Sequence, residues 1–386
     1  MELIRLDGRE GGARIALSAR IAGLRLAEMV VRAPGTWARL AFALGVGVVC
    51  VAGGQASESV PEPRLASLLV DVSGKGITTK RGWSRPREVL RREWLAVLGG
   101  LPARKPPLKT EILNTEHLPE FTRQHVRYQV EDDVFTDGYL LTPEGAKGRL
   151  PAVVVFHPTT PLQAKGVAGM AKEYPEEKWH GVHLAQRGYA VWCPRNYIFA
   201  EGADWKGNAE RVLERHPDWT GMTRMVWDAI RAADFVESLP NADRRRMGCL
   251  GHSLGGKEVL YAMAFDERYK AGVSSEGGIG LGFSNWGDVW YLGPRIKAPG
   301  FQRENHEVLA LIAPRAFVLL AGNSADHEGS RAFIEAARPV YRLFGSEQKL
   351  RFFNHGLGHS YPPEARAIAE EFLDEQLKNS RPANTP

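Results

Sequence analysis

The sequence predicts an α/β protein with a doubly wound, mostly parallel sheet. Two observations indicate this class. Short apolar runs alternate with segments of helical periodicity from residue 150 onward, which is typical of parallel strands joined by helices. Several of these runs are continuously apolar, as expected of strands that are covered on both faces. The chain has 386 residues, 44% hydrophobic and 25% charged, which suits a globular protein with a sizeable core.

The individual elements follow from these patterns. The expected strands are 152–156, 189–193, 247–250, 271–275, 316–320 and 349–353, with edge strands at 126–130 and 138–142. Helical spacing is found at 257–264, from residue 222 onward and at 363–378. A further helix is expected over 86–98, with Pro86 in its first turn and a break at Gly99-Gly100.

The N-terminal residues 1–56 are typical of a secretory signal peptide. A basic flank precedes the apolar run 40–51, and small residues lead to Ala56, where we expect cleavage. The run is too short to span a bilayer. The flank is long, so Met29 is an alternative start. We therefore expect an exported protein with an N-terminal cover and edge strands at 57–135, a catalytic core at 136–378 and a flexible tail at 379–386.

Charge and cysteine content exclude several function classes. The net charge is +5, and the charged residues are interspersed rather than grouped, so we expect no nucleic-acid or membrane partner after cleavage. Cys193 and Cys249 fall in strands that are not neighbours in the expected order, so we expect buried thiols and no disulfide. No Cys/His cluster has metal-ligand spacing, and we expect neither a metal nor a cofactor.

The most informative motif is Gly251-His252-Ser253-Leu254-Gly255, which follows a buried apolar run and precedes a helix. In such a turn the two glycines keep side chains out of a crowded bend, and the serine stands at its tip with the hydroxyl exposed. Ser253 is therefore the expected nucleophile.

A serine needs a base, and the base needs an orienting acid. His359, on the loop after the last expected strand, is the expected base, and His355 is interpreted as a structural loop histidine. Two acids follow neighbouring strands. Either carboxylate could reach His359 from the same edge of the sheet. We expect Asp326 to orient His359, with Glu276 lining the site and sharing the imidazolium charge, and Glu276 as the orienting acid is the alternative.

These motifs resemble the α/β-hydrolase superfamily, in particular its dienelactone-hydrolase-like and acetyl-xylan-esterase-like group, over residues 83 to the C-terminus. The resemblance is carried by Phe156-His157-Pro158, Asp228 and Asp234, the segment 251–256, Ser324-Ala325-Asp326 and Gly358-His359-Ser360-Tyr361-Pro362. It implies a serine hydrolase of carboxylic esters. It also implies that oxyanion donors are the backbone amides of Leu254 and of the loop after His157, namely Pro158 and Thr159.

A narrower resemblance is to the glucuronoyl methylesterases, which carry a lysine four residues after the nucleophile, an acid after the next strand and a tryptophan beyond it. Lys257, Glu276 and Trp286 look like these residues, and Leu254 departs from the arginine that those enzymes carry after the serine. The expected substrate-binding residues are accordingly Lys257, Trp286 and His157.

Together these observations predict an exported serine esterase acting on acetyl or uronate-methyl esters of carbohydrates. Trp205, Trp219, Trp286 and Trp290 lie in segments that would frame the cleft, and indole faces suit sugar rings. Two alternatives stay open. One is a prolyl-oligopeptidase-type peptidase, and the other is a catalytically inactive carbohydrate-binding relative.

Overall fold

The computed structural model describes residues 28–33, 36–41, 65–71, 73–200, 202 and 204–379. The chain divides into two units, residues 1–60 and 61–386. In the first unit, β1 (Glu28–Ala33) pairs antiparallel with β2 (Thr36–Ala41). The predicted cleavage site at Ala56 and most of the predicted apolar run and tail lie outside the described residues. The signal peptide therefore stays a prediction.

The second unit is built on a nine-stranded sheet with the order β11-β10-β9-β8-β6-β7-β5-β4-β3. The six strands from β7 to β11 in this order are parallel, and β5, β4 and β3 add an antiparallel edge. The predicted fold class is confirmed. The strand bounds are β3 (Glu111–His117), β4 (Phe121–Glu131), β5 (Val134–Pro143), β6 (Leu150–Phe156), β7 (Ala190–Pro194), β8 (Ala242–His252), β9 (Tyr269–Ser275), β10 (Ala316–Ala321) and β11 (Leu350–Asn354).

Strand register brings the carboxyl ends of the parallel strands to one edge. Phe156 of β6 pairs with Gly251 of β8, and His252 pairs with Ser275 of β9. On the other side, Leu320 of β10 pairs with Ser275, and Ala321 pairs with Asn354 of β11. The loops that leave these strands therefore begin side by side. In parallel α/β sheets this edge is where sites are built.

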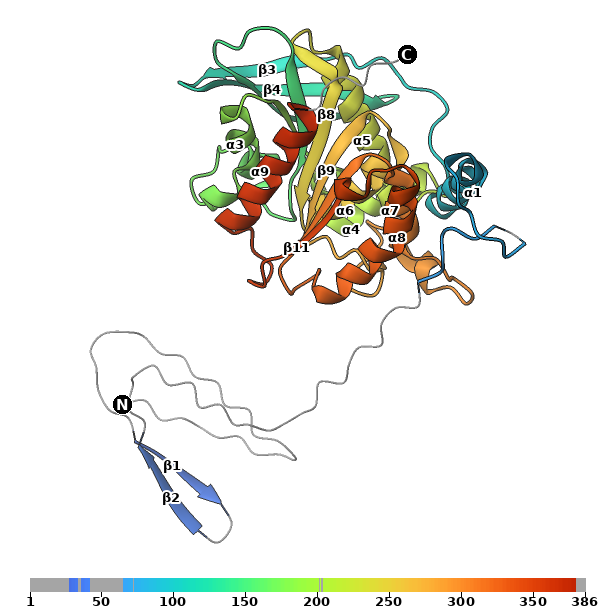
Figure 1. Ribbon diagram of the computed structural model, residues 1–386. Helices are drawn as coiled ribbons and strands as arrows, with labels where there is room; N and C mark the ends of the chain where they lie inside the picture. Colours follow the sequence, from blue (N-terminus) through green and yellow to red (C-terminus); the bar gives the residue numbers. More distant parts are fainter. Residues whose placement is uncertain are drawn as a thin grey trace. The chain divides into compact units, whose positions relative to one another are not determined.

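Helices cover both faces of the sheet, and side chains of each strand alternate between two cores. Val153 and Val155 of β6 belong to the core under α2, α3 and α9, whereas Val154 belongs to the core under α1 and α4 to α8. Figure 1 shows α3 and α9 together on one side of the strands. The helix bounds are α1 (Lys80–Leu98), α2 (Gln163–Val167), α3 (His180–Gln186), α4 (Trp205–Arg215), α5 (Gly221–Ser238), α6 (Leu254–Phe265), α7 (Asn305–Ile312), α8 (Arg331–Leu343) and α9 (Pro363–Leu377).

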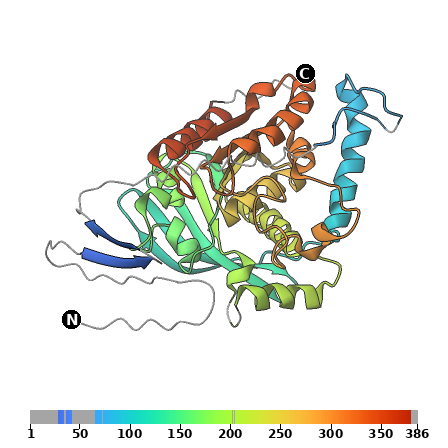
Figure 2. The same cartoon turned by 90° about the horizontal axis from the view of Figure 1, so that it is seen from below.

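The N-terminal cover is the helix α1, which packs against α7 at the side of the unit (Figure 2). Its predicted end is confirmed, because Gly99 caps it with φ of 90°. Its predicted start is wrong. Thr79 Oγ1 accepts the Gly82 N–H at 3.0 Å and starts the helix at Lys80, so Pro86 lies inside the helix rather than in its first turn.

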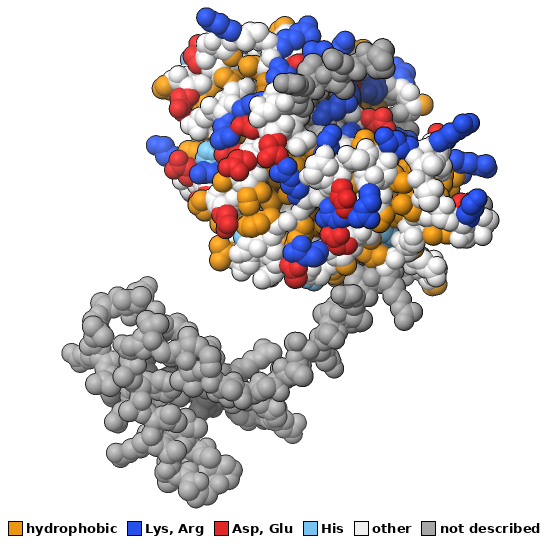
Figure 3. Space-filling model, in the orientation of Figure 1, with side chains coloured by type: hydrophobic (Ala, Val, Ile, Leu, Met, Phe, Trp, Pro, Cys, Tyr) orange, Lys and Arg blue, Asp and Glu red, His pale blue; other side chains and the backbone are white. Residues whose placement is uncertain are grey.

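Cys193 and Cys249 are buried and free, and β6 lies between their strands. The long segment after residue 196 forms a short 3₁₀ helix at Tyr197–Phe199 and then α4, capped by Asp204. Acidic and basic side chains are mixed over the face in Figure 3. Within the residues that the structure describes, no helix combines the length and the apolar character needed to cross a membrane.

Candidate active site

Ser253 lies in a sharp turn between β8 and α6. Its φ and ψ are 60° and −117°, a conformation that costs free energy in residues other than glycine. The turn leaves no room for side chains on either flank. A Cβ on Gly251 would lie 2.2 Å from the Gly255 oxygen, and a Cβ on Gly255 would lie 2.1 Å from the Phe156 oxygen. The geometry predicted for the elbow is therefore present.

Ser253, His359 and Glu276 form a continuous hydrogen-bonded series. His359 Nε2 lies 2.9 Å from Ser253 Oγ, and His359 Nδ1 lies 3.2 Å from Glu276 Oε2. Since a carboxylate only accepts, His359 donates from Nδ1, which leaves Nε2 to accept the serine proton. The Glu276 side chain is completely buried, and that of His359 is 44% exposed. This is the arrangement that activates a serine hydroxyl.

The expectation that Asp326 orients His359 is wrong. Asp326 is fully buried and points at the backbone that follows Glu276: its Oδ2 accepts the Gly278 N–H at 2.7 Å, and its Oδ1 accepts the Ile279 N–H at 2.8 Å. Ser330 Oγ also donates to Oδ1, at 2.9 Å. Burial raises the pKa of the Asp326 carboxyl, against the lowering by these hydrogen bonds.

The physical reason lies in the loop after β10. The Asp326 carbonyl accepts the N–H groups of Asn323 at 2.9 Å and of Ser324 at 3.2 Å. This tight turn directs the N–H groups of Gly322 and Ala325 at Glu276, whose Oε2 lies 2.9 Å from the Ala325 nitrogen. Glu276 therefore takes the place beside the histidine, with the carboxylate held by backbone donors from the loop that carries Asp326.

The three residues that the family resemblance implies as oxyanion donors differ in whether they have a backbone N–H group to donate. Leu254 is the first residue of α6, so its N–H has no acceptor within the helix and points out of the helix N-terminus. Thr159 lines the pocket beside Ser253. Pro158 is an error of the sequence interpretation, because a proline nitrogen carries no hydrogen. Leu254 and Thr159 remain as the candidate pair.

His157 was expected to bind substrate, and the structure contradicts this. Only 1% of its surface is exposed, its Nδ1 lies 2.8 Å from the Pro158 oxygen, and its Nε2 accepts the Asn196 N–H at 3.1 Å. Burial lowers its pKa to about 4, so the imidazole is neutral at pH 7 with the proton on Nδ1. His157 therefore ties the loop after β6 to the loop after β7.

Lys257 and Trp286 form one stack, in which only the lysine reaches the pocket. Lys257 Nζ donates to the Gly277 oxygen at 2.5 Å and to Ser284 Oγ at 2.9 Å, and lies 5.2 Å from the Trp286 ring centre. Burial lowers the pKa of Lys257 to about 8. Trp286 is fully buried and donates to the Gly278 oxygen at 2.6 Å, so the expected sugar contact by this indole is wrong.

Ser253 and His359 line a pocket of about 430 Å³. Sequence reasoning missed part of its wall, which comes from the irregular segment between β9 and α7: Phe283, Ser284, Asn285 and Tyr291. The length of this segment could have indicated its role, because long connections with little regular structure are uncommon and usually functional. Within the described residues, no group of three or more His, Cys, Asp or Glu side chains is placed to bind a metal ion.

Fold and site together define the class of protein. A mostly parallel sheet covered on both faces, with a serine in the turn after β8 and a histidine after β11, is the arrangement of an α/β-hydrolase. Residues 136–285 match the family model described as the dienelactone hydrolase family.

The relatives are hydrolases. The Bacillus subtilis (strain 168) protein YtaP, described as a hydrolase, is 24% identical over 302 residues, which is 74% of this chain and 98% of that protein. Carbohydrate esterase MZ0003, from an unknown prokaryotic organism, is 22% identical over 74% of this chain and 80% of its own length. The solved glucuronoyl esterase from Solibacter usitatus superposes with a TM-score of 0.69 at 22% identity, covering 82% of this chain and 99% of that one. The chain is thus similar to carboxylic ester hydrolases, as the sequence resemblance implied.

Proposed function

We propose that the protein is a serine esterase that cleaves carboxylic esters of carbohydrates through an acyl-enzyme intermediate. The observation that carries the proposal is the series of hydrogen bonds from Ser253 through His359 to Glu276 at the carboxyl edge of the sheet. A structural histidine would have no reason to face the hydroxyl of a residue held at positive φ. The series also argues against the inactive relative, which would lack one of these groups.

The geometry supports an acyl-transfer sequence. Ser253 Oγ attacks the ester carbonyl carbon as His359 Nε2 takes its proton, and the buried Glu276 carboxylate stabilises the resulting imidazolium. The carbonyl oxygen becomes an oxyanion beside the N–H groups of Leu254 and Thr159. Collapse expels the alcohol, which takes the proton from His359. Water then attacks the acyl-enzyme by the same route, releasing the acid and restoring the serine.

Two features support a saccharide ester as substrate. The Lys257 ammonium has three N–H groups and two protein acceptors, which leaves one donor for a sugar hydroxyl in the pocket. Beside the pocket, Phe199, Trp205 and Trp290 line a cleft of about 640 Å³, and Trp205 is 40% exposed. Such aromatic faces suit the apolar faces of pyranose rings. Trp219, by contrast, is buried and stacks on the His216 ring, with 3.8 Å between the ring centres.

The wall of the cleft adjoins the wall of the catalytic pocket. Trp290 lines the cleft, and its neighbour Tyr291 lines the pocket. Likewise, Gln163 at the start of α2 lines the cleft, and Thr159 in the loop after β6 lines the pocket. A chain of sugar rings would therefore extend from the ester toward Trp205. Similarity to a carbohydrate esterase supports the same substrate class.

The decisive experiment compares the chain with its Ser253→Ala variant on acetylated xylan, a methyl glucuronate ester and p-nitrophenyl acetate. We expect hydrolysis of at least one carbohydrate ester, and loss of all activity in the variant with a melting temperature within a few degrees. Turnover by the variant would refute the mechanism, and activity confined to the small acyl ester would refute the carbohydrate assignment. Cleavage of a prolyl peptide instead would favour the peptidase.

The ester type depends on the residue after the nucleophile. Leu254 stands where glucuronoyl methylesterases carry an arginine, so the pocket has one cation fewer than that resemblance would supply. Because the chain departs here from the pattern of those enzymes, an acyl ester such as acetate is favoured over a uronate methyl ester. The ratio of the two rates in the same panel tests the preference.

Export is the second part of the proposal, and it is supported by the pattern of residues 1–56. Expression of the full chain in a bacterial host should yield a mature protein that begins after Ala56. N-terminal sequencing by mass spectrometry checks this, and a retained N-terminus in the cytoplasmic fraction would count against it.

A further inference from the structure

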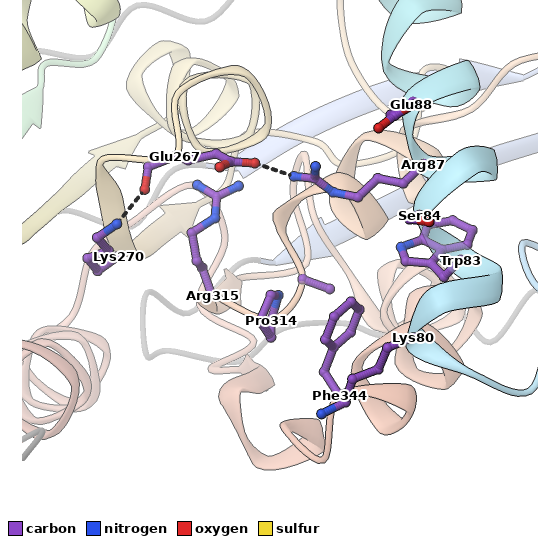
Figure 4. Close-up of a pocket in the computed structure, with 11 residues that line it drawn as sticks. Lys80, Trp83, Ser84, Arg87, Glu88, Glu267, Lys270, Pro314, Arg315 and Phe344 are labelled. Atoms are coloured by element: carbon purple, nitrogen blue, oxygen red, sulfur yellow. Dashed lines mark hydrogen bonds and ion pairs between the residues drawn. The ribbon is translucent and has the colours of Figure 1, made fainter. Parts of the chain in front are cut away.

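A second cavity lies at the opposite end of the sheet from Ser253. It has a volume of about 420 Å³ and is bounded by α1 on one side and by the amino ends of β9 and β10 on the other. Figure 4 shows Lys80, Trp83 and Arg87 reaching from α1 across the cavity from Lys270 and Arg315. The length of β9, about 20 Å at roughly 3.3 Å per residue, separates this cavity from Glu276.

Cations outnumber carboxylates around the cavity. Four cationic side chains line it, and only Glu88 and Glu267 oppose them. Glu267 is paired with Arg87 at 2.8 Å. Arg315 has no carboxylate at ion-pair distance among the described residues; its guanidinium donates to backbone carbonyls, those of Asp266 at 3.0 Å and Tyr269 at 3.1 Å. Among the described residues, Arg87 is thus the only one of these four cations that forms an ion pair.

Neighbouring cations add to the effect of burial on the pKa values of two of these groups, and Glu267 and Asp266 act in the opposite direction. Burial and the neighbouring Arg315 lower the pKa of Lys270. Burial, and to a smaller extent Arg87, lowers the pKa of Arg315. An anion placed between the two walls would relieve this repulsion.

A buried hydrogen-bond donor faces the same space. Trp83 is 1% exposed and lines the cavity, and its Nε1 has no hydrogen-bond partner among the described residues. The nitrogen-bearing edge of the indole is turned toward the cavity in Figure 4. A buried N–H without an acceptor destabilises the fold. A ligand oxygen in the cavity would satisfy it.

We propose that this cavity is an accessory binding site for a small anionic group, a phosphate or a carboxylate, that accepts a hydrogen bond from Trp83 and neutralises Lys80 and Lys270. The volume admits a ligand as large as a monosaccharide, so the group occurs free as phosphate or attached to a sugar as a uronate carboxylate. Because the cavity and Ser253 lie at opposite ends of the strands, binding is independent of the catalytic serine.

The test is a titration of the full chain, labelled with ¹⁵N at its tryptophan indoles, in low-salt buffer. Sodium phosphate and sodium glucuronate are the probes, and glucose is the neutral control. We expect the Trp83 indole resonance, identified by its loss in Trp83→Phe, to shift with saturation on addition of at least one anion. The Ser253→Ala variant should give the same dissociation constant.

Charge removal supplies the control. The exposed side chains of Lys80 and Lys270 can be shortened together, and Lys80→Ser/Lys270→Ser should weaken binding by about tenfold or more. The matched variant Lys165→Ser/Lys172→Ser loses the same charge elsewhere and should bind like the parent.

Each outcome decides the proposal. A response to phosphate alone, to glucuronate alone or to both supports it and identifies which anion the cavity accepts. An unshifted Trp83 resonance with both probes overturns it, as does equal weakening in the two lysine variants. A response to glucose equal to that for glucuronate would show that charge is not what is recognised, and would overturn it as well.

Discussion

Replacing Glu276 by glutamine keeps the size of the side chain and removes its charge. In the structure the carboxylate accepts three N–H groups, from Gly322, Ala325 and His359. A glutamine amide has one acceptor oxygen, so its NH₂ group must face at least one of these donors. With the nitrogen in the Oε2 position it faces His359 Nδ1, and the tautomer in which Nε2 accepts the proton of Ser253 is lost.

We expect kcat for p-nitrophenyl acetate in Glu276→Gln to fall by about 10³- to 10⁴-fold, or about 4 to 5.5 kcal/mol of transition-state stabilisation. KM should change by less than about threefold, because the carboxylate orients the base rather than the substrate. One buried N–H left without an acceptor costs about 1–3 kcal/mol, so the melting temperature should fall by only a few degrees. Initial rates and thermal melts measure the two effects.

The matched variant is Asp326→Asn. Asp326 makes no hydrogen bond to His359, and an asparagine oxygen can still accept from Ile279 while its NH₂ group faces the Gly278 N–H. We expect a loss of stability similar to that of Glu276→Gln, with kcat within about tenfold of the parent. A collapse of kcat in Asp326→Asn beside a near-normal rate in Glu276→Gln would refute the assignment of the acid.

Three further predictions follow from single contacts. Gly255→Ala should give little soluble protein on expression, because its Cβ would lie 2.1 Å from a backbone oxygen of Phe156; normal yield and activity would contradict this. The pKa of Lys257 is about 8 in the folded chain against 10.5 unfolded, so the unfolded chain binds more protons between these values. The free energy of unfolding should therefore rise from pH 8 to 10.5, by about 3 kcal/mol more than in Lys257→Met, and parallel urea-denaturation profiles for the two would refute this. Trp205→Ala should raise KM for an oligosaccharide ester by about fivefold and leave KM for p-nitrophenyl acetate unchanged, if stacking supplies about 1 kcal/mol; equal changes would remove the sugar role.

The sheet was predictable from sequence because its central strands are continuous apolar runs. The strand at 316–320, for example, is completely buried in β10. The strand β3 lies in the region 110–143 that was expected to hold edge strands, but its bounds were not predicted, because most of its residues are exposed and its sequence has no apolar periodicity. The start of α1 was predicted too late along the chain. The helix begins at the Thr79 cap, whereas the prediction placed Pro86 in the first turn.

The serine and the histidine of the site were predictable because each depends on one local feature, a glycine-flanked turn and the loop after the last strand. The acid was not. Glu276 and Asp326 follow adjacent strands at the same edge of the sheet, so position along the chain allows either one to reach His359. The choice depends on a turn closed by the Asp326 carbonyl, and no residue pattern indicated that turn.

Trp286 and His157 were misplaced for a related reason. Sequence position brought both to the correct edge of the sheet, but the direction of a side chain depends on tertiary packing. The Trp286 indole packs beneath Lys257, and the His157 ring bonds to two backbone groups inside the fold. Neither side chain lines the pocket. Trp286 packs against Lys257, which does, and His157 ties the loop after β6 to the loop after β7.

The carboxylates of Glu276 and Asp326 are not interchangeable, because each has different partners. Glu276 accepts a hydrogen bond from His359, whereas Asp326 accepts the backbone N–H groups of Gly278 and Ile279. The carbonyl of Gly278 accepts from Trp286, and the preceding carbonyl accepts from Lys257. Asp326 thus fixes the stretch of backbone that positions the only lysine of the pocket wall within the described residues. The buried carboxylate of Asp326 is needed for the shape of the substrate side of the site. The buried carboxylate of Glu276 is needed for the proton transfer.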